Sequence, residues 1–386
     1  MPLIADLAAI RARFASLPDL AYFSSGSYGL LADSVRAAMV RYLDDRVASG
    51  ADWGEWVGRL EKVRGQVAAL FGVDADEIAI TASASAGINA LASAIDFSGP
   101  RNTVVLSNFE FPTSAQIWHA QEGAGARIVH VAEAPEGIVP LDAFAQAIDE
   151  STAVVAISHI CYRHGGKIPD ADIREIVRIA HARGAIVVLD CYQSAGSERI
   201  DPRALGVDAC VGGMLKYLIG TGGIGYLYVR RGLIETLTPR TTGWFAQAKP
   251  DAMDIFANTP SPTARRFEGG TPPVPSLYGA GAGLDIILDL GIDAIGAHVQ
   301  AITRLALDRL AAEDIGVTTP DDDARRGPLI AIPASDETRL VELLAADKVI
   351  TSSRDGKIRA GFHFYNDADD VERLVRALVK HRALLG

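Results

Sequence analysis

Apolar and polar residues follow one another along the chain in a pattern that predicts strands and helices in alternation. Segments such as TAVVAIS and AIVVLD are almost continuously apolar, as expected of strands that helices cover on both faces of a sheet. Between them, apolar residues recur three and four positions apart, for example over 141–148 and 173–180, which indicates amphipathic helices. The alternation predicts an α/β fold whose large three-layer domain contains a mostly parallel, seven-stranded sheet. The predicted strands are Glu77–Thr81, Thr103–Ser107, Arg127–Val131, Ala153–Ser158, Ala185–Asp190, Ala209–Gly212 and Gly225–Arg230.

The pattern changes after the last of these strands. Residues 239–275 are rich in Pro, Thr and Gly and predict a long irregular excursion, of the kind that usually serves function or forms an interface. Two helices follow, and then an α+β tail that ends in an amphipathic helix over Ala368–Leu385. We therefore expect a large domain over residues 16–275 and a smaller α+β C-terminal domain over 276–386, which residues 1–15 join.

The composition is that of an ordinary globular protein, since 49% of the 386 residues are hydrophobic and 22% are charged. The formal net charge is −11, and no cluster of basic residues interrupts the acidic balance. Nucleic acids and anionic membranes bind basic surfaces, so neither is an expected partner. No run of about 18 uncharged apolar residues occurs, and the sequence therefore predicts no membrane span.

The N-terminal segment and the cysteines indicate a cytoplasmic protein. MPLIADLAAIRARF carries Asp6 and two arginines where a secretory signal peptide needs an unbroken apolar stretch, and it predicts a short amphipathic helix instead. The three cysteines, Cys161, Cys191 and Cys210, are odd in number and lack metal-ligand spacing. Free thiols of this kind are typical of a reducing compartment. We expect no bound metal.

A glycine motif near the end of the sheet is misleading. Gly220, Gly222 and Gly225 satisfy the G-x-G-x-x-G pattern of dinucleotide-binding folds. That pattern needs a strand before it and a helix after it. The residues that follow, YLYV, are β-prone, so the glycines belong to a turn that leads into a strand, and dinucleotide binding is not predicted.

Asp190, Gln193 and Lys216 are the candidate chemical centre. Asp190 ends a predicted parallel strand, and ligands of open α/β sheets bind at the carboxyl ends of such strands. Lys216 follows Gly212 and Gly213 and precedes the glycine turn, a setting that suits an amine that forms a Schiff base. Pyridoxal phosphate chemistry needs both groups, because a carboxylate keeps the pyridine nitrogen protonated while the amine holds the cofactor.

This stretch resembles the cofactor core of the fold-type I pyridoxal phosphate enzymes, specifically the class V aminotransferase group, which includes cysteine desulfurases, kynureninases and various aminotransferases. The resemblance runs from about Tyr22 to Leu385. It implies pyridoxal 5'-phosphate as the cofactor, held as an aldimine on Lys216. It further implies that Asp190 pairs with the pyridine nitrogen and that Gln193 contacts the phenolic oxygen.

Two segments resemble the parts of this group that hold the phosphate and cover the cofactor ring. ITASASAGINALASAI resembles the phosphate loop, which implies that Ser85 and the backbone of Ala84 bind phosphate; the alternative is a serine N-cap without a ligand. NFEFPTSAQIW resembles the stretch that supplies a ring stacked on the cofactor. Phe111 takes that place, and a buried core phenylalanine is the alternative.

Two further segments resemble the dimer contact and the substrate clamp. RRFEGGTPPV resembles a segment in which Thr271 touches the phosphate in the neighbouring subunit, which implies a homodimer with shared active sites. KIRAGFHFYND resembles the strand whose arginine, here Arg359, clamps the substrate carboxylate. The alternative for Arg359 is a surface salt bridge. Kynureninase-like features make Ser27, Tyr162 and Trp244 candidate substrate contacts, with ordinary packing or turn structure as the alternative.

The chain departs from the group at two places. Cysteine desulfurases carry a nucleophilic cysteine in a mobile loop before the arginine strand, whereas residues 349–358 offer Ser352 and Ser353 instead. Desulfurase activity is therefore disfavoured. Many members also have a histidine directly before the Schiff-base lysine, where this chain has Leu215.

The resemblance thus implies an enzyme that acts on a small-molecule amino acid. Transamination is the first hypothesis, because the group as a whole is broad. The alternative is a kynureninase-like or C–S lyase that cleaves at Cβ. A third hypothesis is a non-catalytic α/β binding protein.

Overall fold

The computed structural model describes residue 4 and residues 6–386. The predicted N-terminal helix falls partly on residues 1–3 and 5, which lie outside the described residues. Within the described part, helix α1 spans Leu7–Arg11.

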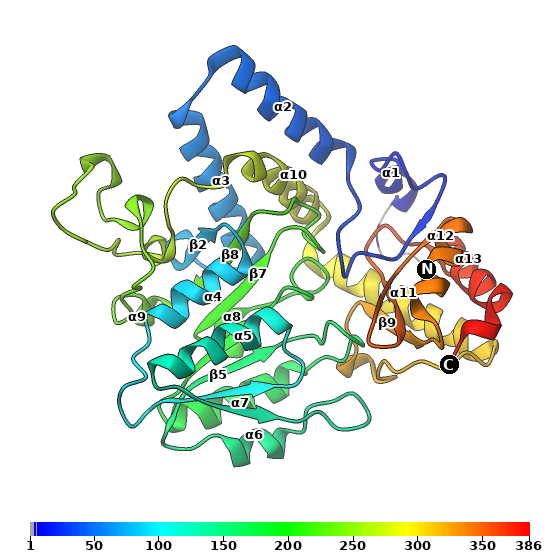
Figure 1. Cartoon of the computed structure of the whole chain (residues 1–386). Coiled ribbons are helices and arrows are strands. Elements are labelled where there is room, and N and C mark those ends of the chain that lie inside the picture. Colours follow the sequence, from blue (N-terminus) through cyan, green and yellow to red (C-terminus); the bar gives the residue numbers. More distant parts are fainter. Residues whose placement is uncertain (1–3, 5) are drawn as a thin grey trace.

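A seven-stranded sheet forms the centre of the molecule, in the order β2-β8-β7-β6-β5-β3-β4 (Figure 1). Only β8 runs antiparallel to its neighbours, β2 and β7, because it follows β7 as a hairpin; the other pairs are parallel. The seven predicted strands are confirmed, each within one residue at either end. Their bounds are β2 Ile78–Thr81, β3 Thr103–Ser107, β4 Arg127–Val131, β5 Thr152–Ser158, β6 Ile186–Asp190, β7 Ala209–Gly213 and β8 Gly225–Val229.

Helices cover both faces of this sheet, so the predicted three-layer α/β arrangement is confirmed. Val155 and Ile157 of β5 face one layer, whereas Val154 and Ala156 face the other, as the two-residue period of a strand requires. The first layer contains α3 Trp53–Phe71, α6 Leu141–Ala147, α7 Asp170–Ala182 and α10 Val274–Leu290, and the second contains α4 Ala84–Ser93 and α5 Pro112–Ala120.

The C-terminal part has a hydrophobic core of its own. A three-stranded antiparallel sheet has the order β11-β12-β9, and β1 pairs with β10 in a two-stranded parallel sheet. The elements are β1 Ala21–Tyr22, β9 Leu329–Pro333, β10 Val349–Ile350, β11 Ser352–Arg354, β12 Lys357–Gly361, α11 Ile292–Ala312, α12 Glu337–Ala346 and α13 Ala368–Lys380. The division into domains at residues 275 and 276 stays a prediction.

Helix α13 is shorter than the sequence pattern predicts. Asp367 and Asp370 form a capping box at its start, but the α-helix ends at Lys380. A single 3₁₀ turn over Arg382–Leu384 follows. The apolar residues at the end of the chain continue the helical period without continuing the helix.

The remaining elements lie at the edges. Residues 239–273 are irregular, as predicted, with short 3₁₀ turns as their helical elements; α10 begins at Val274 and so takes up the last two residues of the predicted excursion. Figure 1 shows this excursion projecting on one side, and α2 standing away from the sheet. The other short or peripheral helices are α2 Asp33–Ser49, α8 Pro202–Leu205 and α9 Arg231–Ile234. Across the described residues, none of the helices combines the length and the apolar character that crossing a membrane demands.

Candidate active site

Most of the predicted site residues converge on one cavity at the edge of the large sheet. It has a volume of about 240 Å³ and lies at the carboxyl ends of β5, β6 and β7, the edge at which open α/β sheets bind ligands. Eight of the predicted residues line it: Ser27, Ala84, Ser85, Phe111, Tyr162, Asp190, Gln193 and Lys216.

Lys216 and Asp190 form the charged centre of the cavity. Asp190 is the last residue of β6, and Lys216 lies in the turn between β7 and β8. Burial raises the pKa of the Asp190 carboxyl, although Oδ1 accepts the Tyr192 N–H at 2.8 Å and Lys216 is nearby. Burial lowers the pKa of the Lys216 amine to about 8, and Asp190 opposes this change. Such an amine is unprotonated in part of the molecules near neutral pH, as a nucleophile or base requires.

The first turn of α4 presents free N–H groups to the cavity. Ser83 is the N-cap, and its Oγ accepts the N–H of Ala86 at 3.1 Å. Within the described part of the chain, no acceptor pairs with the backbone N–H of Ala84 or Ser85. Free N–H groups at the positive end of a helix form a natural phosphate site. The predicted serine N-cap is therefore present, at Ser83 and not at Ser85, and phosphate binding by Ser85 and the backbone of Ala84 stays a prediction.

Phe111 precedes α5 and lines the cavity. The residue is 40% exposed, which excludes the alternative of a buried core phenylalanine. Its ring packs edge-on against Tyr162, with the ring centroids 5.0 Å apart. The Lys216 Nζ lies 5.6 Å from the Phe111 centroid. A planar ligand attached to the Lys216 amine could therefore stack on the ring of Phe111.

A tight hairpin of the C-terminal sheet carries Arg359. Strands β11 and β12 are joined by Asp355 and Gly356 alone, and both residues have a positive φ, of 57° and 72°. A two-residue turn with this backbone is type I′, which fits the twist of a hairpin. It fixes the register so that Ser352 pairs with Arg359.

The guanidinium of Arg359 is buried and has no counter-ion in the described part of the chain. Nη1 donates to the Tyr162 carbonyl at 2.7 Å, and Nη2 donates to Ser27 Oγ at 2.8 Å and Ser352 Oγ at 3.1 Å. Only 4% of the residue is exposed, and its Nε has no partner. Among the described side chains no carboxylate pairs with it, so the alternative of a surface salt bridge is wrong. Since a buried charge needs compensation, this cation attracts an anion.

Gln193 leaves a polar atom free at the cavity. Its Nε2 donates to the carbonyl of Gly26 at 3.1 Å, while its Oε1 is buried and has no partner among the described residues. Buried polar atoms of native proteins are nearly always paired. A polar ligand beside this amide would satisfy it.

Thr271 and Trp244 do not belong to this cavity within one chain. Thr271 lines a separate cleft that borders another face of α4. Trp244 packs edge-on against Trp53 and Phe245, with ring centroids 5.5 Å and 4.7 Å apart. One copy of the chain therefore does not bring these two residues to the other site residues.

Glu110 is a buried carboxyl near the site that the sequence analysis missed. Its oxygens lie 2.8 Å from the hydroxyl of Ser107, 2.9 Å from that of Ser158 and 3.3 Å from that of Ser114. The Ser158 N–H also donates to it at 2.6 Å. Burial, followed by the charge of Asp190, raises the pKa of Glu110 to about 8. With this pKa the carboxyl is mostly protonated at neutral pH.

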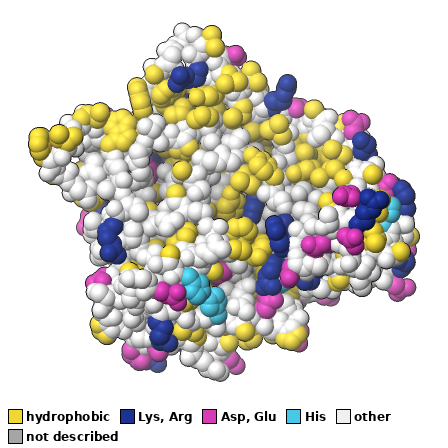
Figure 2. Space-filling model, viewed as in Figure 1, with side chains coloured by type: hydrophobic (Ala, Val, Ile, Leu, Met, Phe, Trp, Pro, Cys, Tyr) yellow, Lys and Arg dark blue, Asp and Glu magenta, His cyan; other side chains and the backbone are white. Residues whose placement is uncertain are grey.

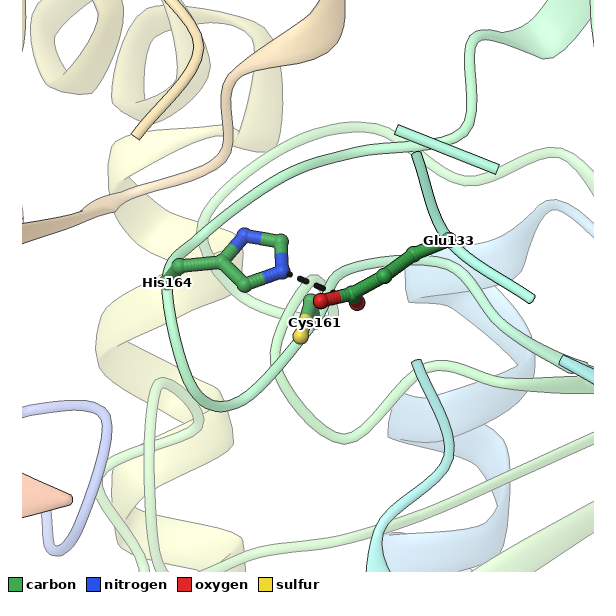
Figure 3. A group of neighbouring side chains, drawn as sticks. All are labelled: Glu133, Cys161 and His164. Atoms are coloured by element: carbon green, nitrogen blue, oxygen red, sulfur yellow. Dashed lines mark hydrogen bonds and ion pairs between the residues drawn. The ribbon is translucent and has the colours of Figure 1, made fainter. Parts of the chain in front are cut away.

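Glu133, Cys161 and His164 form a compact group beyond the ends of β4 and β5 (Figure 3). The Nε2 of His164 lies 3.3 Å from Glu133 Oε2, while its Nδ1 accepts the N–H of Gly166 at 3.1 Å. The proton of a neutral ring is therefore on Nε2, the atom that a metal would require. Arg163 also pairs with Glu133 at 2.6 Å, and burial raises the pKa of the Cys161 thiol to about 11. We interpret this group as an anchor for its loop.

The departures from the resemblance are visible in the structure. Cys161, Cys191 and Cys210 are free and buried. Leu215 lines the cavity next to Lys216 and offers an apolar side chain where a histidine would offer a ring nitrogen.

A lysine turn facing a strand-end aspartate, within a layered fold of this kind, is typical of the fold-type I pyridoxal phosphate enzymes. The chain matches the model of the family "Aminotransferase class-V" over residues 54–374. It therefore belongs to the class V aminotransferases, which are pyridoxal phosphate-dependent enzymes. The family, the fold and the cofactor predicted from the sequence are thereby confirmed, and the non-catalytic hypothesis is set aside.

Relatives match over most of the chain. An uncharacterized aminotransferase of Bacillus subtilis is 30% identical over 365 residues, which cover 95% of each chain. A kynureninase of Deinococcus radiodurans is 30% identical over 347 residues, which cover 84% of this chain and 80% of the relative. In fold, the chain is similar to a cysteine desulfurase of Thermococcus onnurineus, with a TM-score of 0.85, 21% identity and 98% of each chain covered.

The cavity fits the cofactor of this family. It offers an amine with a lowered pKa, a buried carboxyl at a strand end, two unpaired N–H groups at a helix start and an unpaired amide oxygen. In the same order, these groups suit the aldehyde, the pyridine nitrogen, the phosphate and a ring substituent of pyridoxal phosphate.

We expect Glu110→Gln to weaken the pH dependence of stability. A carboxyl whose pKa is about 8 in the folded chain and about 4.3 when unfolded stabilises the fold below its unfolded pKa, and loses that contribution as the pH rises through 8. Between pH 6 and pH 8 the loss amounts to about 2 kcal/mol. Urea unfolding of cofactor-free protein at both pH values should show this loss only when Glu110 is present.

The exposed Glu136 supplies the control. Glu136→Gln also removes one carboxyl, but it should keep the full pH dependence. Equal slopes for the unsubstituted protein and Glu110→Gln would contradict the assignment of a buried, protonated carboxyl.

Proposed function

We propose that this enzyme transaminates an amino acid in the cavity around Lys216. The observation that carries the proposal is the pairing, in one buried site, of an amine with a pKa of about 8 and an arginine without a counter-ion. The amine can take a proton from Cα, and the arginine can bind the α-carboxylate. Both groups are needed wherever an amino acid is the substrate.

Pyridoxal phosphate, when bound, supplies an electron sink for the negative charge that develops at the substrate Cα. In our proposal Lys216 holds the cofactor and Asp190 faces its pyridine nitrogen. The N–H groups of Ala84 and Ser85 bind the phosphate, Phe111 stacks on the ring, and Gln193 contacts the phenolic oxygen.

Lys216 then moves the proton. Burial keeps the pKa of its amine near the operating range of a base. In transamination the same amine would carry the proton from Cα to the cofactor carbon. The ring of Phe111, whose centroid lies 5.6 Å from the amine, covers one side of it.

Arg359 orients the substrate. Its planar guanidinium matches a carboxylate with two parallel hydrogen bonds, which an ammonium does not. Ser27 and Tyr162 hold this guanidinium from two sides, so in our proposal they position the clamp as well as line the substrate space.

The B. subtilis relative, an uncharacterized aminotransferase by name, favours transamination because it matches over 95% of both chains. The second candidate is cleavage at Cβ, which the kynureninase relative favours. Persulfide chemistry is disfavoured, since the three thiols are buried and the β11–β12 hairpin carries serines.

We further propose a homodimer in which each copy completes the other's site. Large apolar side chains are exposed on α2 and on the 239–275 excursion, among them Val47 at 89% and Phe256 at 92%, and Figure 2 shows apolar side chains over these parts of the surface. Contiguous exposed apolar surface indicates an interface. Thr271 and Trp244 lie away from their own chain's cavity, which supports their contribution to the neighbour's.

The buried free thiols support a cytoplasmic location. A reducing compartment keeps such thiols unpaired. Fractionation of the host cell would test the proposal.

Lys216 provides the direct test of function. We expect borohydride treatment of the full-length holoenzyme to leave a reduced pyridoxyl group on Lys216, found by mass spectrometry of peptides. Lys216→Ala should lower turnover of an amino-acid panel by about 10²–10⁴-fold, the usual contribution of a positioned acid–base group. A pyridoxyl group on another lysine would contradict the assignment.

The products distinguish the two candidate reactions. A transaminase releases a keto acid and then needs a second keto acid as amino acceptor, whereas Cβ cleavage releases pyruvate or alanine.

Arg359 tests the carboxylate clamp. We expect Arg359→Lys and Arg359→Met to lower kcat/KM for an amino acid by about 30-fold or more, because losing a buried charged partner costs about 2 kcal/mol or more. Cofactor content should stay unchanged. The amine with the same side chain but no carboxylate is the matched probe, and its turnover should be unaffected. An equal loss for both compounds would refute the clamp.

The shared site is tested by mixing two inactive variants. We expect Lys216→Ala and Thr271→Glu to be inactive alone, the second because its charge repels the phosphate. A mixed dimer pairs an intact Lys216 with an intact Thr271 from the other copy, so refolding the two together should restore a measurable fraction of activity. No recovery in isolated mixed dimers would mean that each copy works alone.

A further inference from the structure

Tyr192 occupies a central position in the cavity that no motif assigns. It follows Asp190 by two residues, and its N–H donates to the Asp190 Oδ1 at 2.8 Å. Its ring centroid lies 4.3 Å from the Lys216 Nζ, compared with 5.6 Å for Phe111. The amine thus lies near two aromatic rings, and Tyr192 is the closer one.

The Tyr192 hydroxyl lies against the backbone of β7. A Cβ atom at Gly213 would collide with this hydroxyl, so the strand provides the space only because residue 213 is glycine. Gly213 pairs with Gly225 of β8. A Cβ atom at Gly225 would in turn lie 2.7 Å from the N of Ala84.

These contacts place the hydroxyl at the α4 end of the cavity. Directly opposite residues of an antiparallel pair point to the same face of the sheet, with Cβ positions about 4.5–5.5 Å apart. The hydroxyl that fills the space above Gly213 is therefore next to the helix start that abuts Gly225. The side chain extends from the Asp190 end of the cavity to the end where the N–H groups of α4 are free.

The hydroxyl is available as a donor. Among the described residues it has no hydrogen-bond partner, and the residue lines the cavity without being fully buried. Burial, followed by the charges of Asp190 and Tyr28, raises the pKa of the Tyr192 phenol above its ordinary value. The phenol therefore keeps its proton at neutral pH.

We propose that Tyr192 binds the cofactor, with its ring as a platform beneath the pyridine and its hydroxyl as a donor to the phosphate. This inference depends on the proposed function, since it needs the cofactor on Lys216. It also accounts for two local features. Gly213 leaves room for the tyrosine, and the apolar Leu215 beside the lysine contributes no donor of its own.

The test compares two ligands that differ only in the phosphate. Full-length holoenzyme is resolved with hydroxylamine and titrated with pyridoxal phosphate or with pyridoxal, and tryptophan fluorescence reports binding. A hydrogen bond to a charged group contributes about 1.5–3 kcal/mol, so Tyr192→Phe should weaken pyridoxal phosphate binding about tenfold or more. Pyridoxal binding should stay the same. Tyr192→Leu, which also removes the platform, should weaken both.

Tyr226→Phe is the matched control. The Tyr226 hydroxyl fills the corresponding space at Gly212, on the opposite face of the same strand, so removing it should change neither affinity. Gly213→Ala should reproduce the loss seen in Tyr192→Phe, because the added methyl group displaces the tyrosine. This second variant tests the placement without altering Tyr192 itself.

The outcomes separate this inference from the proposed function. Equal affinities for Tyr192→Phe and the unsubstituted protein, or equal losses for both ligands, would overturn the phosphate contact. In either case borohydride would still fix the cofactor on Lys216, and the proposed function would stand. If the unsubstituted protein takes up no cofactor on Lys216, both are overturned.

Discussion

The active site depends on holding a carboxyl group and an amine together where neither is well solvated. Burying either charge alone is costly, and here Asp190 and Lys216 each moderate the change that burial makes to the other's pKa. The sheet makes this possible, because β5 and β6 end side by side, with Ser158 and Asp190 in register. The β7–β8 hairpin then returns the chain across the same edge. Because helices cover both faces of the sheet, Asp190 and Lys216 are largely shielded from water.

A second cation, next to the cavity, comes from a different part of the chain. Arg359 is held by a carbonyl and two hydroxyls, which are neutral groups. The C-terminal sheet therefore places a cation at the site, and the groups that hold this cation in position do not neutralise its charge. Together with the free N–H groups of α4, it makes both ends of the cavity attractive to anions. An amino acid joined to a phosphorylated cofactor is a ligand with anions at two ends.

The fold and the centre of the site could be predicted from the sequence because both depend on local signals. Strand patterns and the chain order of Asp190, Gln193 and Lys216 can be read without knowing which strands are neighbours. Glu110 could not be found in this way, since its significance comes from serines on β3, β5 and α5 that meet only in the folded chain. Thr271 belongs to a cleft away from the cavity, and the role proposed for it depends on a second copy of the chain.

The two-residue turn between β11 and β12 limits how this protein can vary. Exposed loop tips normally accept insertions at little cost. Here Asp355 and Gly356 set the pairing of Ser352 with Arg359, and a slip of one residue would turn every side chain of β12 to the other face. An added residue must then be absorbed as a bulge, or the guanidinium leaves the cavity. The length of this hairpin tip is thus under constraint, in addition to the residue types that its two positive φ angles favour.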